Sequence, residues 1–532
     1  MKKNILSFPY YLFVFPLFYV LNLYSINIGE VGFDVTIRPV FILFLIALAF
    51  LGLFHVISRN SRNASFLAFL WLFFLLFYGR VYLYLKVHPI FGMNLGHHVI
   101  FGAVWILLFL VISVLIVSKR IKFSNNVNIF MNFVTVLLLI SSTYSVLHIR
   151  KQYSLNSTGQ NGSNLALSKQ QTWLKDVSQP LASSEALGKL PDIYYIIPDM
   201  FTRGDALLAE TGYDNSAFIK ELKKLGFYVA ECSRSNYAST QLSIASSLNM
   251  SYLDQIQDGM TDRVMLVEPM SDSLVRSSLE ALGYSTVVLE NGFGLPELHN
   301  PAITISTQTK FFLCEPYNPF ESLIVNNSFL RIFYDVNFGP LSRMYDKLFF
   351  PYTAHVLAQK TIFDQLPNIA PTDGPKFVFA HIMMPHPPFL IHADGTVETD
   401  SRYYREALGQ PVTEELYLQG YLMQAEYVQN RLPDIIKQIL AESETDPIII
   451  IQGDHGIRDG NRLDILNAYY VPKSIQEKLY QNITPVNTFR VIFDNVFGTN
   501  YGLLPDKSWY SVYPEWFDMQ ISAEHNPGCT PK

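Results

Sequence analysis

Cysteine is scarce in this sequence, and its few residues lie far apart. Among 532 residues only Cys232, Cys314 and Cys529 occur, and their spacing matches neither a zinc cluster nor a disulfide framework. One disulfide is possible, but three thiols cannot all pair. We therefore expect free or partly buried cysteines.

An excess of positive charge is also missing. The formal net charge at pH 7 is −6, from 39 Lys and Arg against 45 Asp and Glu. Proteins that bind nucleic acid usually present a basic patch. Nucleic acid is therefore not an expected partner.

Apolar residues are abundant, and they are concentrated before His148. Each of five apolar runs is close to the ~20 residues that cross a bilayer, which predicts a bundle of about five transmembrane helices. The runs are Phe8–Asn27, Arg38–Val56, Ser65–Leu85, His98–Val117 and Asn128–His148. Because the first run lacks a small-residue cleavage site and similar runs follow it, a cleaved signal peptide is not expected.

The charges between the runs predict the orientation of the helices. Basic residues lie in alternate loops: Lys2 and Lys3, then Arg59 and Arg62, then Lys119, Arg120 and Lys122. Since loops rich in Lys and Arg stay inside, the N-terminus is expected inside and the chain after five crossings outside. Arg150 and Lys151 run against this pattern. The expected location is a bacterial-type inner or plasma membrane, with the soluble domain extracytoplasmic.

A polar linker separates the apolar part from a second kind of sequence. Residues 151–190 are rich in Ser, Asn, Gln and Gly, a linker composition. Short apolar runs then alternate with amphipathic helical segments, which predicts an α/β domain with a mostly parallel sheet. The expected strands are Pro191–Pro198, Phe227–Ala230, Ser285–Leu289, Lys376–Ile382 and Pro447–Ile451. The expected organisation is thus a membrane bundle at 1–150, a linker at 151–190 and a catalytic domain at 191–532.

One stretch of the second part does not follow this alternation. Residues 310–366 are dense in Phe and Tyr. We expect an insertion that packs on the sheet. The alternative is a surface that dips toward the bilayer, because aromatic side chains favour the membrane interface.

Polar side chains follow three of the predicted strands. Asp199 ends the first strand, His386 follows Lys376–Ile382, and Asp454-His455 follows Pro447–Ile451. Ligands of open α/β sheets bind beyond the carboxyl ends of the strands. Carboxylates and an imidazole at this edge suit a divalent metal ion, although a single Asp or His is often structural.

In a fourth segment, residues 236–248, small hydroxylated residues stand at the start of a predicted helix. A hydroxyl at a helix N-terminus lies in a positive field beside free N–H groups, which suits a nucleophile that attacks phosphate. The alternative is simple N-capping by Ser239 or Thr240.

In chain order, these residues form a pattern that resembles the alkaline phosphatase/sulfatase superfamily. The pattern comprises Asp199 after a strand, Thr240 with Ser243, His386 in a Pro-His-Pro-Pro turn, and Asp454-His455-Gly456. Five membrane helices before an extracytoplasmic domain resemble, within it, the lipoteichoic acid synthase and phosphoethanolamine transferase group. The resemblance covers roughly residues 191–513 and the membrane topology. It implies an alkaline-phosphatase-like fold and a divalent metal ion, zinc or manganese, with magnesium as an alternative. It further implies metal ligands at Asp199, Thr240, Asp454 and His455.

The resemblance also implies roles in catalysis. Thr240 would be the nucleophile, and His386 would contact the substrate or protonate the leaving group. We add Asn236 and Arg234 as candidates that hold a non-bridging phosphate oxygen.

The sequence departs from the family pattern in two places. Thr240-Gln-Leu-Ser-Ile244 lacks the Pro and Arg of the sulfatase frame, which disfavours sulfate-ester hydrolysis. Asp199 stands where the membrane transferases commonly have Glu, and this leaves open one metal or two. His381, His392 and His525 are candidates for further ligands.

The function implied is transfer of a phospho-headgroup, of the phosphoethanolamine or phosphoglycerol type, through a phospho-threonine. The donor would be a membrane phospholipid, and the acceptor a surface glycan or glycolipid. One alternative is a phosphodiesterase or phosphatase of the same fold. Another is a sulfatase-like protein or an inactive membrane-anchored scaffold.

Overall fold

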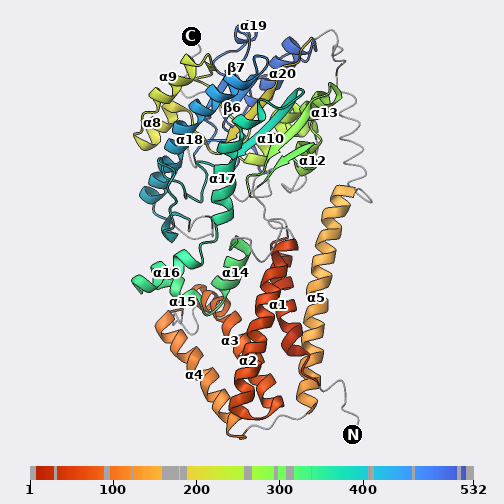
Figure 1. The fold of residues 1–532 in the computed structure, drawn as a ribbon, viewed down its shortest axis with the longest axis vertical. Coiled ribbons are helices and arrows are strands. Elements are labelled where there is room, and N and C mark those ends of the chain that lie inside the picture. The colour runs from red at the N-terminus through yellow and green to blue at the C-terminus, as the bar shows by residue number, and fades with distance from the viewer. Residues whose placement is uncertain are drawn as a thin grey trace. The chain divides into compact units, whose positions relative to one another are not determined.

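The computed structural model describes residues 8–28, 33–88, 96–120, 125–158, 179, 188–256, 266–292, 298–306, 317–336, 338–404, 407, 412–457, 462–511 and 517–522. The chain divides into two compact units (Figure 1). The first comprises residues 1–153 and 308–354, and the second residues 154–307 and 355–532. The predicted division followed chain order, whereas in the structure residues 308–354 are part of the first unit.

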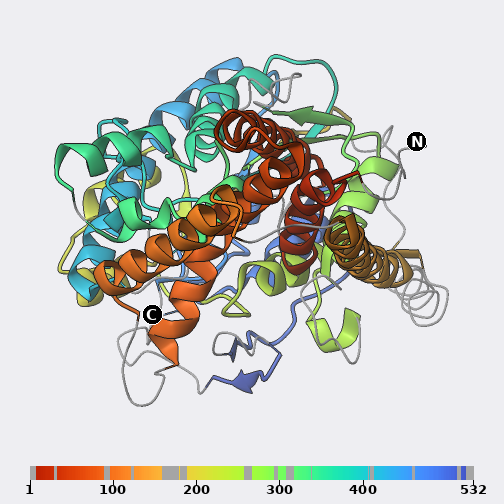
Figure 2. The same cartoon turned by 90° about the horizontal axis from the view of Figure 1, so that it is seen from below.

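Helices form at all five of the apolar runs. They are α1 (Tyr11–Ile26), α2 (Ile37–Ser58), α3 (Ser61–Val87), α4 (His98–Val117) and α5 (Asn125–Thr158). Four candidate spans, Phe33–Ser58, Ser61–Lys86, His98–Val117 and Asn125–Ile149, are long and apolar enough to cross a membrane. Helix α1 is apolar but has 16 residues, which corresponds to about 24 Å. In Figures 1 and 2, α4 and α5 lie on opposite sides of the other three helices.

The aromatic insertion packs on these helices. It forms α14 (Pro319–Asn327), α15 (Arg331–Asp335) and α16 (Pro340–Leu348). Phe329 donates its N–H to the carbonyl of Leu75 at 2.7 Å, and its ring lies 4.9 Å from that of Tyr78. The expectation that the whole insertion packs on the sheet is therefore wrong for these helices. Aromatic side chains of the insertion pack against aromatic side chains of α3.

An ion pair and a histidine–aspartate contact attach the insertion to helix ends. Arg38, in the first turn of α2, binds Glu321 through both carboxylate oxygens, at 2.6 and 2.5 Å. His98, the first residue of α4, lies 2.9 Å from Asp335. Tyr24, in the last turn of α1, contributes a ring contact to Phe320. The insertion thus lies where α1 ends and where α2 and α4 begin.

The second unit is built on a mixed sheet of order β2-β7-β6-β1-β5-β3-β4. Its strands are β1 (Ile193–Pro198), β2 (Tyr228–Val229), β3 (Ser285–Leu289), β4 (Ile303–Ile305), β5 (Lys376–Ile382), β6 (Ile448–Gln452) and β7 (Asn467–Tyr470). Only β7 runs against the others. The mostly parallel α/β fold is therefore confirmed, and all five predicted strands are present. A separate small ribbon pairs β8 (Trp509–Tyr510) with β9 (Gln520–Ile521).

Helices cover the sheet because its central strands are apolar on both faces. Ile193, Tyr195 and Ile197 join one core with residues of α10, α13 and α20, and the alternate side chains of β1 point to the other face. The helices of this unit are α8 (Gly204–Thr211), α9 (Ser216–Lys224), α10 (Thr240–Asn249), α11 (Leu253–Ile256), α12 (Val267–Ser271), α13 (Leu274–Ala281), α17 (Thr353–Gln365), α18 (Glu414–Glu442), α19 (Lys473–Gln476) and α20 (Pro485–Val496).

Cys232 lies in the second unit and is disulfide-bonded. The expectation of free cysteines is therefore wrong at this position. The residues around the other two cysteines lie outside the described residues.

Candidate functional site

Asp199 lies at the carboxyl end of β1, at the start of a tight turn. The next residue, Met200, has φ +62, a conformation that L residues with large side chains rarely adopt. Its N–H donates to Asp454 Oδ1 at 3.0 Å, and its carbonyl accepts from the buried Tyr421 hydroxyl at 2.9 Å. These bonds hold the turn, so Asp199 has a fixed position.

Asp454 and His455 follow β6, which is the neighbour of β1 in the sheet. Gly453 precedes them, and a Cβ there would lie 2.6 Å from the carbonyl oxygen of Phe201. Glycine therefore lets the chain after β6 approach the chain after β1. Both Asp454 and His455 are buried.

Thr240 is the first residue of α10, and Ser239 is its N-cap. The Ser239 side chain makes no capping hydrogen bond, so the capping alternative does not explain this hydroxyl-rich start. Thr240 Oγ1 instead lies 3.3 Å from His455 Nε2. The helix places a half-buried hydroxyl beside the residues that follow β6.

In the structure the four predicted ligands lie close together, and His381 lies beside them. His455 Nε2 lies 3.5 Å from Asp454 Oδ2 and 3.8 Å from Asp199 Oδ1. Ligand atoms of Asp199, His381 and Asp454 lie within 4.8 Å of one another. His381 is on β5, opposite Ile197 of β1. Of the two additional histidines that the structure describes, His381 and His392, it is His381 that joins the cluster.

The cluster suits a divalent cation. Asp199 Oδ1 and Asp454 Oδ2 are buried and have no hydrogen-bond partner, and an unsatisfied buried carboxylate oxygen is costly. A cation between the carboxylates would satisfy both oxygens, and the oxygen and nitrogen donors suit zinc or manganese. Asp199, Thr240, Asp454 and His455 are the residues that would hold it.

The charge states of the cluster follow from burial and from neighbouring groups. Burial and the negative charge of Asp199 raise the pKa of Asp454 to about 7. Burial would also raise the pKa of Asp199, but the neighbouring imidazoles, led by His386, outweigh it and lower that pKa. Burial and the cationic Arg462 lower the pKa of His455 to about 3. His455 is therefore neutral near pH 7 and has a free lone pair, as a metal ligand requires.

His386 lies in the loop after β5, close enough to influence the charge of Asp199 and His455. The His386 Nδ1 lies 2.6 Å from the carbonyl oxygen of Pro387, and Gln424 Nε2 donates to the carbonyl oxygen of His386 at 3.0 Å. Since a carbonyl only accepts, Nδ1 carries the proton and Nε2 is left to exchange one. Burial and then the charge of His386 lower the pKa of nearby His355 to about 4.

The two proposed phosphate contacts differ in the partners that they already have. Asn236 Oδ1 accepts from Val486 N–H at 2.8 Å, and its Nδ2 donates to the Lys507 carbonyl at 2.7 Å. These bonds give the buried amide a structural role. Arg234 donates to Ser522 Oγ at 2.9 Å and lies 3.6 Å from Asp464. Substrate contact by either residue stays a prediction.

The remaining two histidine candidates are not part of the cluster as described. His392 is 40% exposed and pairs with Glu398 at 3.2 Å. His525 lies outside the described residues.

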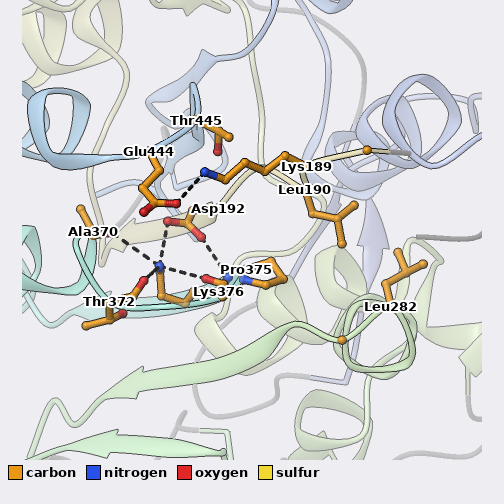
Figure 3. Close-up of a pocket in the computed structure, with 13 residues that line it drawn as sticks. Lys189, Leu190, Asp192, Leu282, Ala370, Thr372, Pro375, Lys376, Glu444 and Thr445 are labelled. Carbon is orange, nitrogen blue, oxygen red and sulfur yellow. Dashed lines mark hydrogen bonds and ion pairs between the residues drawn. The ribbon is translucent and has the colours of Figure 1, made fainter. Parts of the chain in front are cut away.

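A pocket of about 320 Å³ lies at the amino-terminal ends of β1 and β5, opposite the strand ends that carry the cluster (Figure 3). Lys376 Nζ points to Asp192 at 3.1 Å and to the carbonyls of Ala370, Thr372 and Gly374. Because its charge is neutralised and its donors are used, this lysine stabilises the strand starts. The pocket is separate from the cluster of Asp199 and Asp454.

No family model and no curated protein matches this sequence. Several solved structures are similar to it. The Zn-complexed periplasmic domain of phosphoethanolamine transferase EptC from Escherichia coli is 12% identical, with a TM-score of 0.39, over 64% of this chain and 96% of that chain. The lipooligosaccharide phosphoethanolamine transferase EptA from Neisseria meningitidis, an integral membrane protein, is 12% identical, with a TM-score of 0.35, over 93% and 97%. A putative sulfatase from Bacteroides thetaiotaomicron is 14% identical, with a TM-score of 0.35, over 63% and 76%.

Proposed function

We propose that this protein transfers a phospho-headgroup from a membrane phospholipid to a surface glycan or glycolipid, with Thr240 as nucleophile. One observation carries the proposal. Thr240 is the first residue of α10, and its hydroxyl lies beside a buried group of two carboxylates and imidazoles, in which two carboxylate oxygens have no hydrogen-bond partner. A helix N-terminus and a cation both favour a phosphoryl group at this position.

A divalent ion held by Asp199, Thr240, Asp454 and His455 would lower the pKa of the Thr240 hydroxyl and offset charge on the phosphoryl oxygens. The Thr240 hydroxyl proton passes to solvent and returns when Thr240 is released at the end of the cycle. Thr240 Oγ1 attacks phosphorus, and a phospho-threonine forms as the bond to the lipid alkoxide breaks. Protonated His386 gives its Nε2 proton to that alkoxide. In the second step neutral His386 takes the proton of the acceptor hydroxyl, whose oxygen displaces Thr240.

The location of the domain supports a lipid donor. Insertion helices α14 and α15 contact the end of α1 and the starts of α2 and α4, the ends that the charge pattern assigns to the outside. Cys232 is disulfide-bonded, which is typical of an oxidising, extracytoplasmic compartment. ATP is not available there, whereas phospholipid headgroups are.

The experiment uses the purified full-length chain in lipid nanodiscs that contain phosphatidylethanolamine or phosphatidylglycerol. We expect diacylglycerol release and an intact-protein mass adduct on Thr240 equal to the transferred headgroup. The Thr240→Ala variant should lose both, and Thr240→Ser should keep part of the activity because it keeps the hydroxyl. His386→Gln should slow diacylglycerol release because it removes the proposed proton donor. The matched control is His392→Gln, which removes an imidazole outside the cluster.

The products distinguish this proposal from the alternatives of the same fold. Free phospho-headgroup without transfer to an added glycolipid would establish a phosphodiesterase. Release of sulfate from a sulfated glycan would establish sulfatase activity. A protein without bound metal and without turnover would establish a scaffold and contradict the proposal.

A further inference from the structure

Helix α16, in the first unit, carries an exposed apolar face. Leu341, Met344 and Leu348 are 44, 53 and 64% exposed. Their spacing of three and four residues puts them on one side of the helix. The face is formed by large aliphatic side chains of one short, well-defined helix.

A second helix of the same length shows how unusual this face is. Helix α9 is also nine residues long and amphipathic, but its apolar residues Phe218 and Leu222 are buried, at 6 and 0% exposure. In α16 only Tyr345 is buried, and it packs on Phe333 and Phe349. The remaining apolar face of α16 needs another covering.

The position of α16 indicates what covers it. Helix α15 precedes α16 and lies against the start of α4, where Ile332 comes within 3.7 Å of the Cβ position of Gly102. Figure 1 shows α16 running sideways beyond this end of α4. Val99 and Val104 at the same end of α4 are 84 and 59% exposed, as expected of residues that face lipid. The apolar face of α16 is therefore beside a surface that already requires lipid.

The charges of α16 fit the same partner. Arg343 and Lys347 are exposed, and Lys347 borders the apolar face on the side of Met344, with Arg343 next to it. Basic residues next to an apolar helical face are typical of helices that lie in the membrane interface, where they meet lipid phosphates. Tyr78 and Tyr82 of α3, which contact the insertion, are residue types that favour this level of a bilayer.

From these observations we infer that α16 lies in the outer surface of the bilayer, with Leu341, Met344 and Leu348 in the acyl region and Arg343 and Lys347 at the phosphates. This role does not depend on the chemistry at Thr240, because only the first unit takes part.

Spin labels on single cysteines test the inference in the full-length chain, with all three native cysteines, Cys232, Cys314 and Cys529, replaced by Ser. Labels are placed at Leu348→Cys and at Leu208→Cys, a 48% exposed leucine of α8 that serves as control. The protein is studied in nanodiscs of phosphatidylcholine and phosphatidylglycerol with one copy per disc. We expect the ratio of oxygen to water-soluble nickel accessibility to be several-fold higher at Leu348 than at Leu208. Equal ratios at both positions would overturn the inference.

Three further measurements exclude other occupants and a folding artefact. An immobilised label at Leu348 would indicate a protein partner, and dipolar coupling in two-copy discs that is absent from one-copy discs would indicate a second copy; either result contradicts the lipid assignment. In the variant Leu341→Glu with Leu348→Glu, a label at Met344→Cys should move into water. Retained diacylglycerol release would show that this variant is folded, and failure of the proposed chemistry would leave the accessibility ratios unaffected.

Discussion

His381 Nε2 lies 3.2 Å from Asp199 Oδ2, while Asn291 Nδ2 lies 2.9 Å from His381 Nδ1. Because the amide nitrogen donates, Nδ1 accepts and the imidazole proton is on Nε2, where it can be donated to Asp199. Oδ2 therefore faces His381, and Oδ1 lies 3.8 Å from His455 Nε2. We infer that His381 supports Asp199, the carboxylate that its Nε2 faces.

Removal of this support should weaken metal binding. We expect His381→Ala to reduce zinc affinity by about 10–100-fold, as is usual when a residue behind a ligand is lost. Isothermal titration with zinc or manganese measures the change. The variant His392→Gln should bind as the wild type does, and an unchanged affinity in His381→Ala would contradict the role.

Metal binding should depend on pH through Asp454. Its pKa is raised to about 7, so the folded metal-free protein holds a proton that the unfolded chain, with a pKa of about 3.9, releases. This group stabilises the metal-free fold at low pH, and the stabilisation is lost as pH rises through 7. A metal displaces the proton, so the metal-induced rise in Tm should be larger at pH 8 than at pH 6.

The variant Asp454→Asn separates this effect from general pH sensitivity. It should show little metal-induced change in Tm at either pH, while Asp364→Asn, which alters an exposed aspartate paired with Arg431, should keep the wild-type difference. Thermal unfolding at the two pH values, with and without chelator, gives the comparison. The pKa of Asp199 is lowered and that of His455 is about 3, so neither should titrate in this range.

The ion pair of Arg38 and Glu321 should stabilise the attachment of the insertion. Both side chains are mostly buried, at 11 and 8% exposure. Arg38→Met would leave the buried carboxylate without a partner, and such losses cost about 3–5 kcal/mol. The double variant with Glu321→Leu should recover much of this loss. The exposed pair of Lys189 and Glu444 is the control, because Lys189→Met should change stability by at most about 1 kcal/mol.

Gly79 provides a test of the packing between α3 and α14. A Cβ at Gly79 would collide with the backbone of Asn326 and Asn327, whereas a Cβ at Gly52 of α2 would meet nothing within 4 Å. Gly79→Ala should therefore lower the Tm of the detergent-solubilised protein. Gly52→Ala should leave it equal or raise it slightly, since Ala favours helix by about 1 kcal/mol over Gly. Equal effects would show that the two helices do not pack closely.

The sequence was sufficient for the elements that are determined by their own pattern. The apolar length of the membrane helices and the continuous apolar runs of β1, β5 and β6 identify these elements without tertiary information. Strand β7 was missed because Asn467-Ala-Tyr-Tyr470 is short and lacks a distinctive period. Asp199, Asp454 and His455 could be placed near one another from the sequence, because the carboxyl ends of parallel strands meet at the same end of a sheet.

Other features depend on which surfaces meet, and a one-dimensional pattern does not contain this. The aromatic residues of the insertion show that it needs an apolar partner, but not that the partner is α3 rather than the sheet. His381 was a candidate without a place, because its contact with Asp199 depends on the register of β5 against β1. A histidine inside a strand that is buried on both faces was the available signal, since a buried imidazole needs partners.

The insertion has a practical consequence for protein production. A fragment that begins near residue 188 would keep α14 and α15 while losing the helices that bury Phe320, Phe329 and the Arg331–Asp335 pair. Such a fragment should aggregate or require detergent, even though its sheet and the cluster of Asp199, Asp454 and His455 are complete. A soluble version of the second unit would have to omit residues 308–354 as well as the N-terminal helices. Two separate parts of the sequence must therefore be removed.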